Sequence, residues 1–348
     1  MKVLILKPSS LGDVVQALPV LRLIRKHRRD ADVFWWIDTS LSPLLEGDPD
    51  LAGLIRFDRR GWMSPMNWAE IWRTVQEIRC HAFDWVIDLQ SLARSGIVAW
   101  LANGDFTVGL DDAREGARCF YDVAVRRPTW DTHAVDWYLQ VLPVLGIPNH
   151  GAFDWLPVRK PQAAAVREKW APAGRRLIVL QPGARWWNKR WPLEHFVQLV
   201  RRLAAEHADL DFAVLGGMAD RSLGEAIRAA CPERCLDLTG RTSLLEMVEW
   251  IRAGTVMVAN DTGPMHVAAA VGVPVVGLFG PTEPRRTGAY GQRDGILQTH
   301  LPCVPCMKES CSRALPLECL RSISPEAVLS RLRELLDAPA RNRRAPSG

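Results

Sequence analysis

The sequence lacks any long hydrophobic run. None of its 348 residues lies in a stretch that approaches the roughly 20 consecutive apolar residues of a membrane-spanning helix. The apolar segment after Met1 is short, and no small-residue cleavage site follows it, so it predicts a buried strand rather than a secretory signal. We therefore expect a cytoplasmic protein, at most peripheral on a membrane.

Low-complexity tracts and repeats of solenoid period are also missing. The first strand-turn has no G-x-G-x-x-G fingerprint, which disfavours a nicotinamide dehydrogenase. No basic-aromatic recognition module accompanies the formal net charge of +5. Small phosphorylated ligands are therefore more plausible partners than nucleic acid. The hydrophobic fraction of 48% and charged fraction of 24% are typical of a globular protein, and the length predicts two domains.

Short apolar runs alternate with longer segments of helical periodicity. This pattern predicts an α/β protein with parallel sheets and helices on both faces. The strands are expected at residues 3–6, 33–37, 85–89, 177–180, 212–215, 256–259 and 273–279, and the clearest helices at 14–24, 68–78, 192–203 and 244–251.

A Gly-Ile-Pro break at 146–148 and a Pro- and Ala-rich segment up to Gly174 indicate a linker. We expect domains over 1–160 and 161–338, with ligands bound in a cleft between the carboxyl edges of two sheets. The last helix, about 324–336, could return to the N-terminal domain, and a basic flexible tail at 339–348 would follow it.

A turn of small and polar residues, Lys7-Pro8-Ser9-Ser10-Leu11-Gly12-Asp13, follows the first predicted strand. Such a turn directs NH groups and hydroxyls toward a ligand, and Gly12 permits close approach. Asp13 falls in the first turn of the next helix, where the dipole favours its ionised form. Ser10 or Asp13 could simply cap this helix. The functional alternative makes Asp13 a general base.

The segment Asn260-Asp261-Thr262-Gly263-Pro264-Met265-His266 lies between a strand and a helix. Asp261 or Thr262 can cap this helix, while NH groups around Gly263 can bind an anion. His266 would donate to phosphate or ribose from the first turn; the alternative is a structural histidine. In this setting we favour an anion site.

Lys189 and Arg190 also lie between a strand and a helix. They could give fixed positive charge to a pyrophosphate leaving group, or form a solvated pair at a helix entrance. The turn-rich loop over 280–291 is expected to line the same cleft.

Four of the eight cysteines are grouped with the spacing Cys303-x2-Cys306-x4-Cys311-x7-Cys319. In a cytosolic chain this grouping suggests a structural zinc, although it lacks the two matched pairs of a zinc ribbon. Free thiols, or disulfides formed after lysis, are the alternatives.

Taken together, these motifs resemble glycosyltransferase family 9, which contains the ADP-heptose:lipopolysaccharide heptosyltransferases. The similarity rests on the turn ending in Asp13 with Leu18-Pro19, on Lys189-Arg190-Trp191-Pro192, and on the segment from Asp261 to His266 with Phe279-Gly280-Pro281-Thr282. The segment Arg185-Trp186-Trp187-Asn188 departs from the family pattern because it is bulkier than the residues usually found before that lysine.

The resemblance implies a GT-B fold with two Rossmann-like domains. The N-terminal domain would hold a lipid A–Kdo type acceptor at the cytosolic face of the inner membrane, and the C-terminal domain would hold ADP-heptose. The donor residues implied are Lys189, Thr242, Asp261, Thr262, Gly263, His266 and Asp220, with Thr242 near adenine and Asp220 near ribose. The acceptor residues implied are Ser9, Ser10, Gly12, Arg59 and Arg60. The arginine pair is more like the enzyme of the first heptose and the cysteine group more like that of the second, so the acceptor stays open.

The expected reaction is an inverting, metal-independent transfer of heptose to Kdo or heptose of the lipopolysaccharide inner core. Asp13 would take the proton of the acceptor hydroxyl, and no cofactor would be required beyond the structural zinc suggested above. We see no Asp-x-Asp motif placed to hold a catalytic metal. The alternatives are a non-catalytic nucleotide-sugar-binding protein or a transferase of another nucleotide-sugar on the same fold. An epimerase would need a second acid-base residue.

Overall fold

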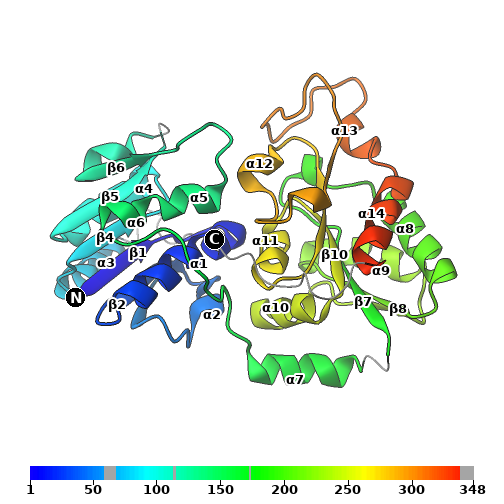
Figure 1. Ribbon diagram of the computed structural model, residues 1–348, viewed down its shortest axis with the longest axis horizontal. Helices are drawn as coiled ribbons and strands as arrows, with labels where there is room; N and C mark the ends of the chain where they lie inside the picture. Colours follow the sequence, from blue (N-terminus) through cyan, green and yellow to red (C-terminus); the bar gives the residue numbers. More distant parts are fainter. Residues whose placement is uncertain (59–67, 113–114, 172–173, 338–348) are drawn as a thin grey trace. The chain divides into compact units, whose positions relative to one another are not determined.

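A computed structural model describes residues 1–58, 68–112, 115–171 and 174–337 (Figure 1). The chain divides into two compact units between Pro157 and Val158. The expected boundary lay at 160/161. None of the described helices is long and apolar enough to cross a membrane.

The first unit is built on a six-stranded parallel sheet with the order β3-β2-β1-β4-β5-β6. Its strands are β1 (Lys2–Leu6), β2 (Asp32–Asp38), β3 (Gly53–Phe57), β4 (Trp85–Asp88), β5 (Phe106–Asp111) and β6 (Val123–Arg126). Its helices are α1 (Leu11–His27), α2 (Ser42–Leu45), α3 (Trp68–Cys80), α4 (Ala93–Ala102), α5 (Ala134–Leu139) and α6 (Val141–Val144). The strand order reverses between β1 and β4, which is where α/β sheets usually bind ligands.

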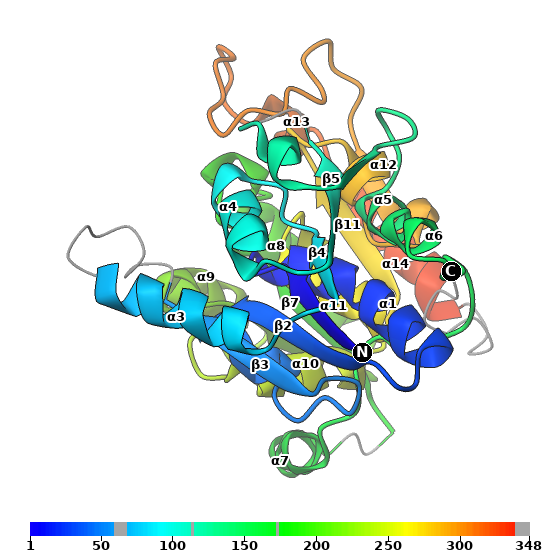
Figure 2. The same ribbon diagram turned by 90° about the vertical axis from the view of Figure 1, so that its left-hand side faces the viewer.

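Helices cover both faces of this sheet. On one face, α3 and α4 lie side by side (Figure 2), and Ile78, Val98 and Ala102 pack onto the sheet residues Leu4 and Val86. Elsewhere, α5 packs against α1, which is buried along most of its length. This packing places residues distant in the sequence beside the turn that follows β1.

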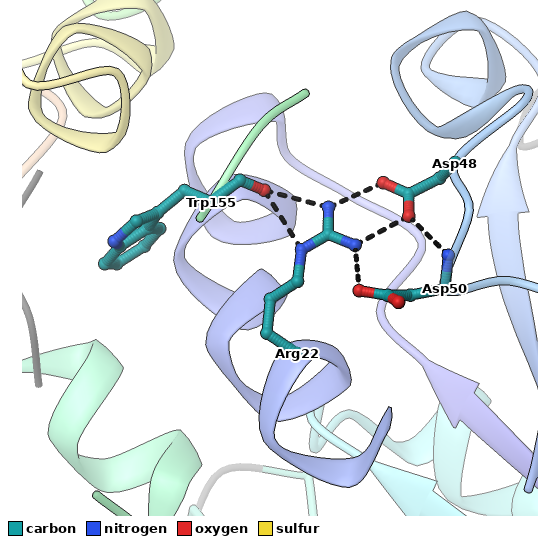
Figure 3. Close-up of polar contacts among 4 residues, drawn as sticks. All are labelled: Arg22, Asp48, Asp50 and Trp155. Atoms are coloured by element: carbon teal, nitrogen blue, oxygen red, sulfur yellow. Dashed lines mark hydrogen bonds and ion pairs between the residues drawn. The ribbon is translucent and has the colours of Figure 1, made fainter. Parts of the chain in front are cut away.

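A buried arginine joins three segments of the first unit (Figure 3). Arg22 of α1 makes a two-pronged contact with Asp48, 2.6 Å at each oxygen, and a third with Asp50 at 2.7 Å. It also donates to the carbonyl of Trp155 at 2.9 Å. The guanidinium therefore fastens the end of the unit to its first helix.

The second unit repeats the topology of the first. Its order β12-β11-β10-β7-β8-β9, taken from β9, is again 3-2-1-4-5-6 with all pairs parallel. The strands are β7 (Arg176–Gln181), β8 (Leu210–Val214), β9 (Cys235–Asp237), β10 (Val256–Asn260), β11 (Val275–Phe279) and β12 (Ile296–Gln298). The helices are α7 (Lys160–Lys169), α8 (Leu193–Glu206), α9 (Arg221–Arg228), α10 (Leu244–Ala253), α11 (Gly263–Ala270), α12 (Pro284–Thr287), α13 (Glu318–Arg321) and α14 (Pro325–Asp337).

The final helix α14 belongs to the second unit. Val328, Leu329 and Leu332 lie in the same core as Phe196 of α8 and Val258 of β10. The sequence left open a return of this helix to the N-terminal domain, but its apolar face packs within the second unit.

The seven predicted strands and four clearest helices are confirmed, with ends shifted by a few residues. The strands β3, β5, β6, β9 and β12 were not predicted. Most are short or only partly buried, so their apolar pattern is weak.

Candidate active site

The turn after β1 carries the first part of the site. Ser10 is the N-cap of α1 in an extended conformation, and Asp13 lies three residues later. Asp13 Oδ2 accepts a hydrogen bond from the Ser10 NH at 2.9 Å and another from Ser10 Oγ at 2.7 Å. Asp13 therefore does cap the turn through Oδ2, while Oδ1 lies 3.5 Å from the hydroxyl of Tyr138.

Charged groups are buried behind this turn. Lys7 is 3% exposed, and its Nζ donates to the carbonyl of Leu89 at 2.8 Å. Burial acts to lower the pKa of Lys7, but Tyr138, Asp13 and Asp88 outweigh it and raise the pKa above its ordinary value. Lys7 is therefore a buried cation at neutral pH, at the point where the strand order reverses.

Asp88 ends β4 next to this cation and is fully buried. Its carboxylate accepts hydrogen bonds from the NH groups of Gln90 at 2.8 Å and Ser91 at 3.1 Å, and from Tyr121 OH at 2.7 Å. Burial raises the pKa of Asp88, and these hydrogen bonds oppose that effect. The same contact and burial raise the pKa of Tyr121, so its hydroxyl remains a donor.

In the second unit, the carboxyl ends of β7 and β10 carry an ion pair. Lys189 Nζ lies 2.6 Å from Asp261 Oδ2, and Thr282 Oγ1 donates to the same oxygen at 2.6 Å. The ammonium also lies 4.4 Å from the centre of the Trp186 ring. The bulky tryptophan before the lysine thus has a local role, because its ring face holds the ammonium in place.

The helix α11 begins directly beside this pair. Thr262 is its N-cap, Gly263 its first residue, and Pro264 follows in the first turn. The preceding Asn260 is fully buried and holds the two ends of the segment between β7 and α8, accepting from Trp191 NH at 3.0 Å and donating to the Pro182 carbonyl at 2.7 Å. The NH groups and positive dipole end of α11 therefore start from a rigid base next to Lys189.

Asp220 and Thr242, predicted near the ribose and the adenine of the sugar donor, lie at the same edge of the sheet. Asp220 follows β8, and its carboxylate accepts from the NH of Gly217 at 3.0 Å. Gly183 passes so close that a Cβ there would lie 2.4 Å from Asp220 Oδ2. Thr242 follows β9, immediately before Ser243, which caps α10. The loops after five strands, β7 to β11, thus supply Lys189, Asp220, Thr242, Asp261 and Thr282 to one edge.

Comparison with known proteins matches residues 71–315 to the family model described as glycosyltransferase family 9 (heptosyltransferase), which is more than half of the 348-residue chain. The chain belongs to glycosyltransferase family 9. It is therefore a glycosyltransferase, as its motifs predicted.

Full-length relatives and solved structures agree with this assignment. This family 9 glycosyltransferase is 29% identical to lipopolysaccharide heptosyltransferase 1 of Pseudomonas aeruginosa over 97% of this chain and 99% of the relative. It is 34% identical to lipooligosaccharide heptosyltransferase 2 of Haemophilus influenzae over a shorter match, which covers 53% of this chain and 57% of the relative.

The solved Escherichia coli ADP-heptose lipopolysaccharide heptosyltransferase II superposes with a TM-score of 0.77 at 23% identity, covering 97% of this chain and 98% of that one. The E. coli heptosyltransferase WaaC with ADP-2-deoxy-2-fluoro heptose gives a TM-score of 0.75 at 23% identity, covering 96% and 99%. These likenesses confirm the predicted GT-B fold.

The role of every predicted site residue of this family 9 enzyme stays a prediction. Arg59 and Arg60 lie outside the described residues. Ser9 and Gly12 lie in the turn before Asp13, with Gly12 buried, and His266 is 9% exposed in the first turn of α11. Their roles stay predictions.

The four grouped cysteines line one cavity of about 110 Å³ in the second unit, together with Asn188 and Arg313. All are free thiols. Burial raises the pKa of Cys319, and the other three sulfurs raise it further. Across residues 1–58, 68–112, 115–171 and 174–337, however, no set of three or more His, Cys, Asp or Glu side chains is placed to hold a metal ion. The structural zinc stays a prediction from spacing.

Sequence reasoning missed three side chains of the site. Thr282 lay inside a recognised loop, but nothing local marked its bond to Asp261. Trp186 was treated only as a departure from the family pattern. Tyr138 carries no signal in the sequence, because only the packing of α5 on α1 brings it to Asp13.

Proposed function

We propose that this glycosyltransferase transfers heptose from ADP-heptose, with inversion, to Kdo or heptose of the lipopolysaccharide inner core. The observation that carries this proposal is the Lys189–Asp261–Thr282 cluster beside the N-terminus of α11. Two relatives are named as a lipopolysaccharide heptosyltransferase and a lipopolysaccharide core heptosyltransferase, which supports transfer of heptose to lipopolysaccharide. The titles of two solved WaaC structures, with ADP and with ADP-2-deoxy-2-fluoro heptose, support the donor.

The donor diphosphate is proposed to bind at this cluster. Lys189 is the cation, and Asp261, whose Oδ2 also accepts a hydrogen bond from Thr282, fixes its position. As the glycosidic bond breaks, negative charge grows on the departing diphosphate. The ammonium and the dipole end of α11 would stabilise that charge, so we propose that no divalent metal is required for the reaction.

Asp13 is the proposed base. An inverting transfer needs one group that accepts the proton of the attacking acceptor hydroxyl. Oδ2 of Asp13 accepts two short hydrogen bonds from Ser10, whereas the contact of Oδ1 with Tyr138 OH is longer, at 3.5 Å, so Oδ1 is the oxygen we propose for this task. The proposed base belongs to the first unit and the proposed donor residues belong to the second, so we assign the acceptor to the first unit and the donor to the second.

Calorimetry with ADP, UDP and GDP tests the donor, and turnover of ADP-heptose with Kdo-terminated and heptose-terminated acceptors tests the reaction. We expect selective ADP binding and transfer to one of the acceptors. Binding of UDP alone would overturn the donor assignment. An Asp13→Ala variant that binds ADP and still turns over at the parent rate would overturn the role of the base. A parent protein that binds ADP but transfers nothing would favour a non-catalytic binding protein.

We also propose peripheral binding to anionic membranes through the outer surface of α3 and α4. Trp72 is 61% exposed on α3, while Ile97 and Trp100 are 43% and 63% exposed one turn apart on α4. Among the side chains of α3 and α4 that the structure describes, the exposed charged ones are mostly cationic: Arg73, Arg79 and Arg94 against Glu77. Tryptophan with arginine suits the interface of an anionic bilayer.

Sedimentation with vesicles of neutral and of anionic phospholipid tests this surface. The parent should bind the anionic vesicles, and the double variant Trp72→Ser/Trp100→Ser should bind several-fold less. Trp130→Ser, at another exposed tryptophan of the same unit, is the matched control. Undiminished binding of the double variant, or an equal loss in the control, would exclude this surface.

A further inference from the structure

Two buried side chains lie behind the proposed base. We infer that Lys7 and Tyr138 act as positioning residues that orient the Asp13 carboxylate and keep it ionised. This inference rests on the proposed role of Asp13 as the base. It gives Lys7 and Tyr138 a role in the reaction in addition to their role in the packing of the first unit.

Asp13 has a contact at each of its carboxylate oxygens. Ser10 holds Oδ2 through two hydrogen bonds at 2.9 and 2.7 Å. These bonds set the torsion about Cβ–Cγ, because rotation would carry Oδ2 away from Ser10. Tyr138 OH faces the other oxygen, Oδ1, at 3.5 Å, which is long for a hydroxyl-to-carboxylate bond but places the hydroxyl where it can stabilise charge on Oδ1. Ser10 and Tyr138 thus flank the carboxylate on its two sides.

Tyr138 is itself firmly placed. It lies on α5, which packs against α1, and it is 5% exposed. Burial raises the pKa of its hydroxyl, and Asp13 raises it further, while Lys7 and Arg127 act in the opposite direction. The net result is a hydroxyl that remains protonated and so can donate toward Asp13.

Lys7 supplies the charge. Its Nζ lies 4.7 Å from the centre of the Tyr138 ring and is anchored to the Leu89 carbonyl at 2.8 Å. Asp13 and Asp88 are the anions that act on it, and both raise its pKa. A buried cation near a carboxylate favours the ionised form of the carboxylate. Lys7 therefore keeps Asp13 ready to accept a proton.

A purely structural role is the competing explanation, because Lys7 could serve only to balance buried Asp88. Tyr121 allows the two explanations to be separated. Its hydroxyl donates to Asp88 at 2.7 Å, so Tyr121→Phe removes a buried hydroxyl from the same region without touching Asp13. Tyr138→Phe and Tyr121→Phe are therefore a matched pair.

The experiment is steady-state kinetics over a range of pH on the full chain. Tyr138→Phe should lower kcat roughly ten- to a hundredfold, with the donor KM nearly unchanged. The acid limb of its kcat profile should move to higher pH, because the carboxylate loses a stabilising donor. Lys7→Met should move that limb further in the same direction. Tyr121→Phe should keep the parental kcat and limb, whatever stability it loses.

Parental kcat and pH profile in Tyr138→Phe would overturn the inference, and so would an equal fall in kcat for Tyr121→Phe. Tyr138→Phe decides the question even if Lys7→Met does not fold. Asp13→Asn in the same assay separates this inference from the proposed function. If Asp13→Asn is inactive while Tyr138→Phe is parental, only the positioning role fails. If Asp13→Asn is active, the proposed base itself fails.

Discussion

Replacing Arg22 with methionine should strongly destabilise the first unit. Methionine keeps much of the side-chain volume but removes the charge that Asp48, Asp50 and the Trp155 carbonyl share. The side chain of Asp48 is only 1% exposed, so its carboxylate would be left buried and unpaired. Removing one partner of a buried ion pair typically costs about 3–5 kcal/mol. The Asp50 contact adds less, because that side chain is 31% exposed and its pairing is screened by solvent.

The pH dependence has a defined sign. Burial acts to lower the pKa of Arg22, but its hydrogen bonds with Asp48 and Asp50 outweigh burial and raise the pKa above its ordinary value. The contribution of the arginine to stability is therefore fully present at neutral pH and is lost only in strongly alkaline solution, above the unfolded-state pKa. In Arg22→Met the penalty comes from the lone Asp48 carboxylate.

Urea unfolding and hydrogen exchange provide the assay. Because two units unfold, exchange in peptides covering α1 and residues 152–157 should be followed beside the global signal. The double variant Arg22→Met/Asp48→Asn removes the lone charge and should recover roughly half of the loss. A single variant within about 1 kcal/mol of the parent at pH 7, or a double variant no more stable than the single, would refute this reasoning.

Three further predictions concern the second unit. Lys189→Met should weaken ADP binding roughly 10- to 100-fold by calorimetry, because a charged partner of the diphosphate is lost. Arg185 is an exposed residue of the same loop, and the control variant Arg185→Met should bind ADP like the parent. Gly183→Ala places a Cβ where Asp220 now lies, so the carboxylate must move. We expect about tenfold weaker ADP binding. An unchanged affinity would show that Asp220 is not part of the donor site. Burial raises the pKa of Cys235 to about 12, so iodoacetamide at pH 8 should leave this thiol unmodified in the folded protein while exposed Cys80 reacts, as mass spectrometry of the peptides can show.

Sequence periodicity identified the buried central strands because their apolar runs are continuous. Leu177 to Leu180 and Val256 to Ala259 are fully buried on both faces of their sheet, and such strands are almost wholly apolar. The edge strands β6 and β12 are only partly buried, so their residues carry no comparable signal. Their existence follows from pairing with β5 and β11, a long-range effect that local sequence does not contain.

The site shows the same division between local and long-range information. Asp13, Thr262 and Gly263 were identified because a strand-turn-helix junction constrains a few neighbouring residues. The ion pair between Lys189 and Asp261 was not predicted, although both residues were, because they lie 72 positions apart in the sequence. Tyr138 is 125 positions from Asp13. Contacts of this kind depend on how helices pack on the sheet, and single-sequence motifs do not report it.

The position of α14 has a consequence for synthesis of the chain on the ribosome. The first unit is complete by Pro157 and can fold while the remainder is still being translated. The second unit cannot, because Val328, Leu329 and Leu332 of its core come from the last described helix. The nascent second unit therefore exposes an unfinished apolar surface over β10 and β11 until α14 has been synthesised. This interval is when the chain is most exposed to aggregation and depends most on chaperones.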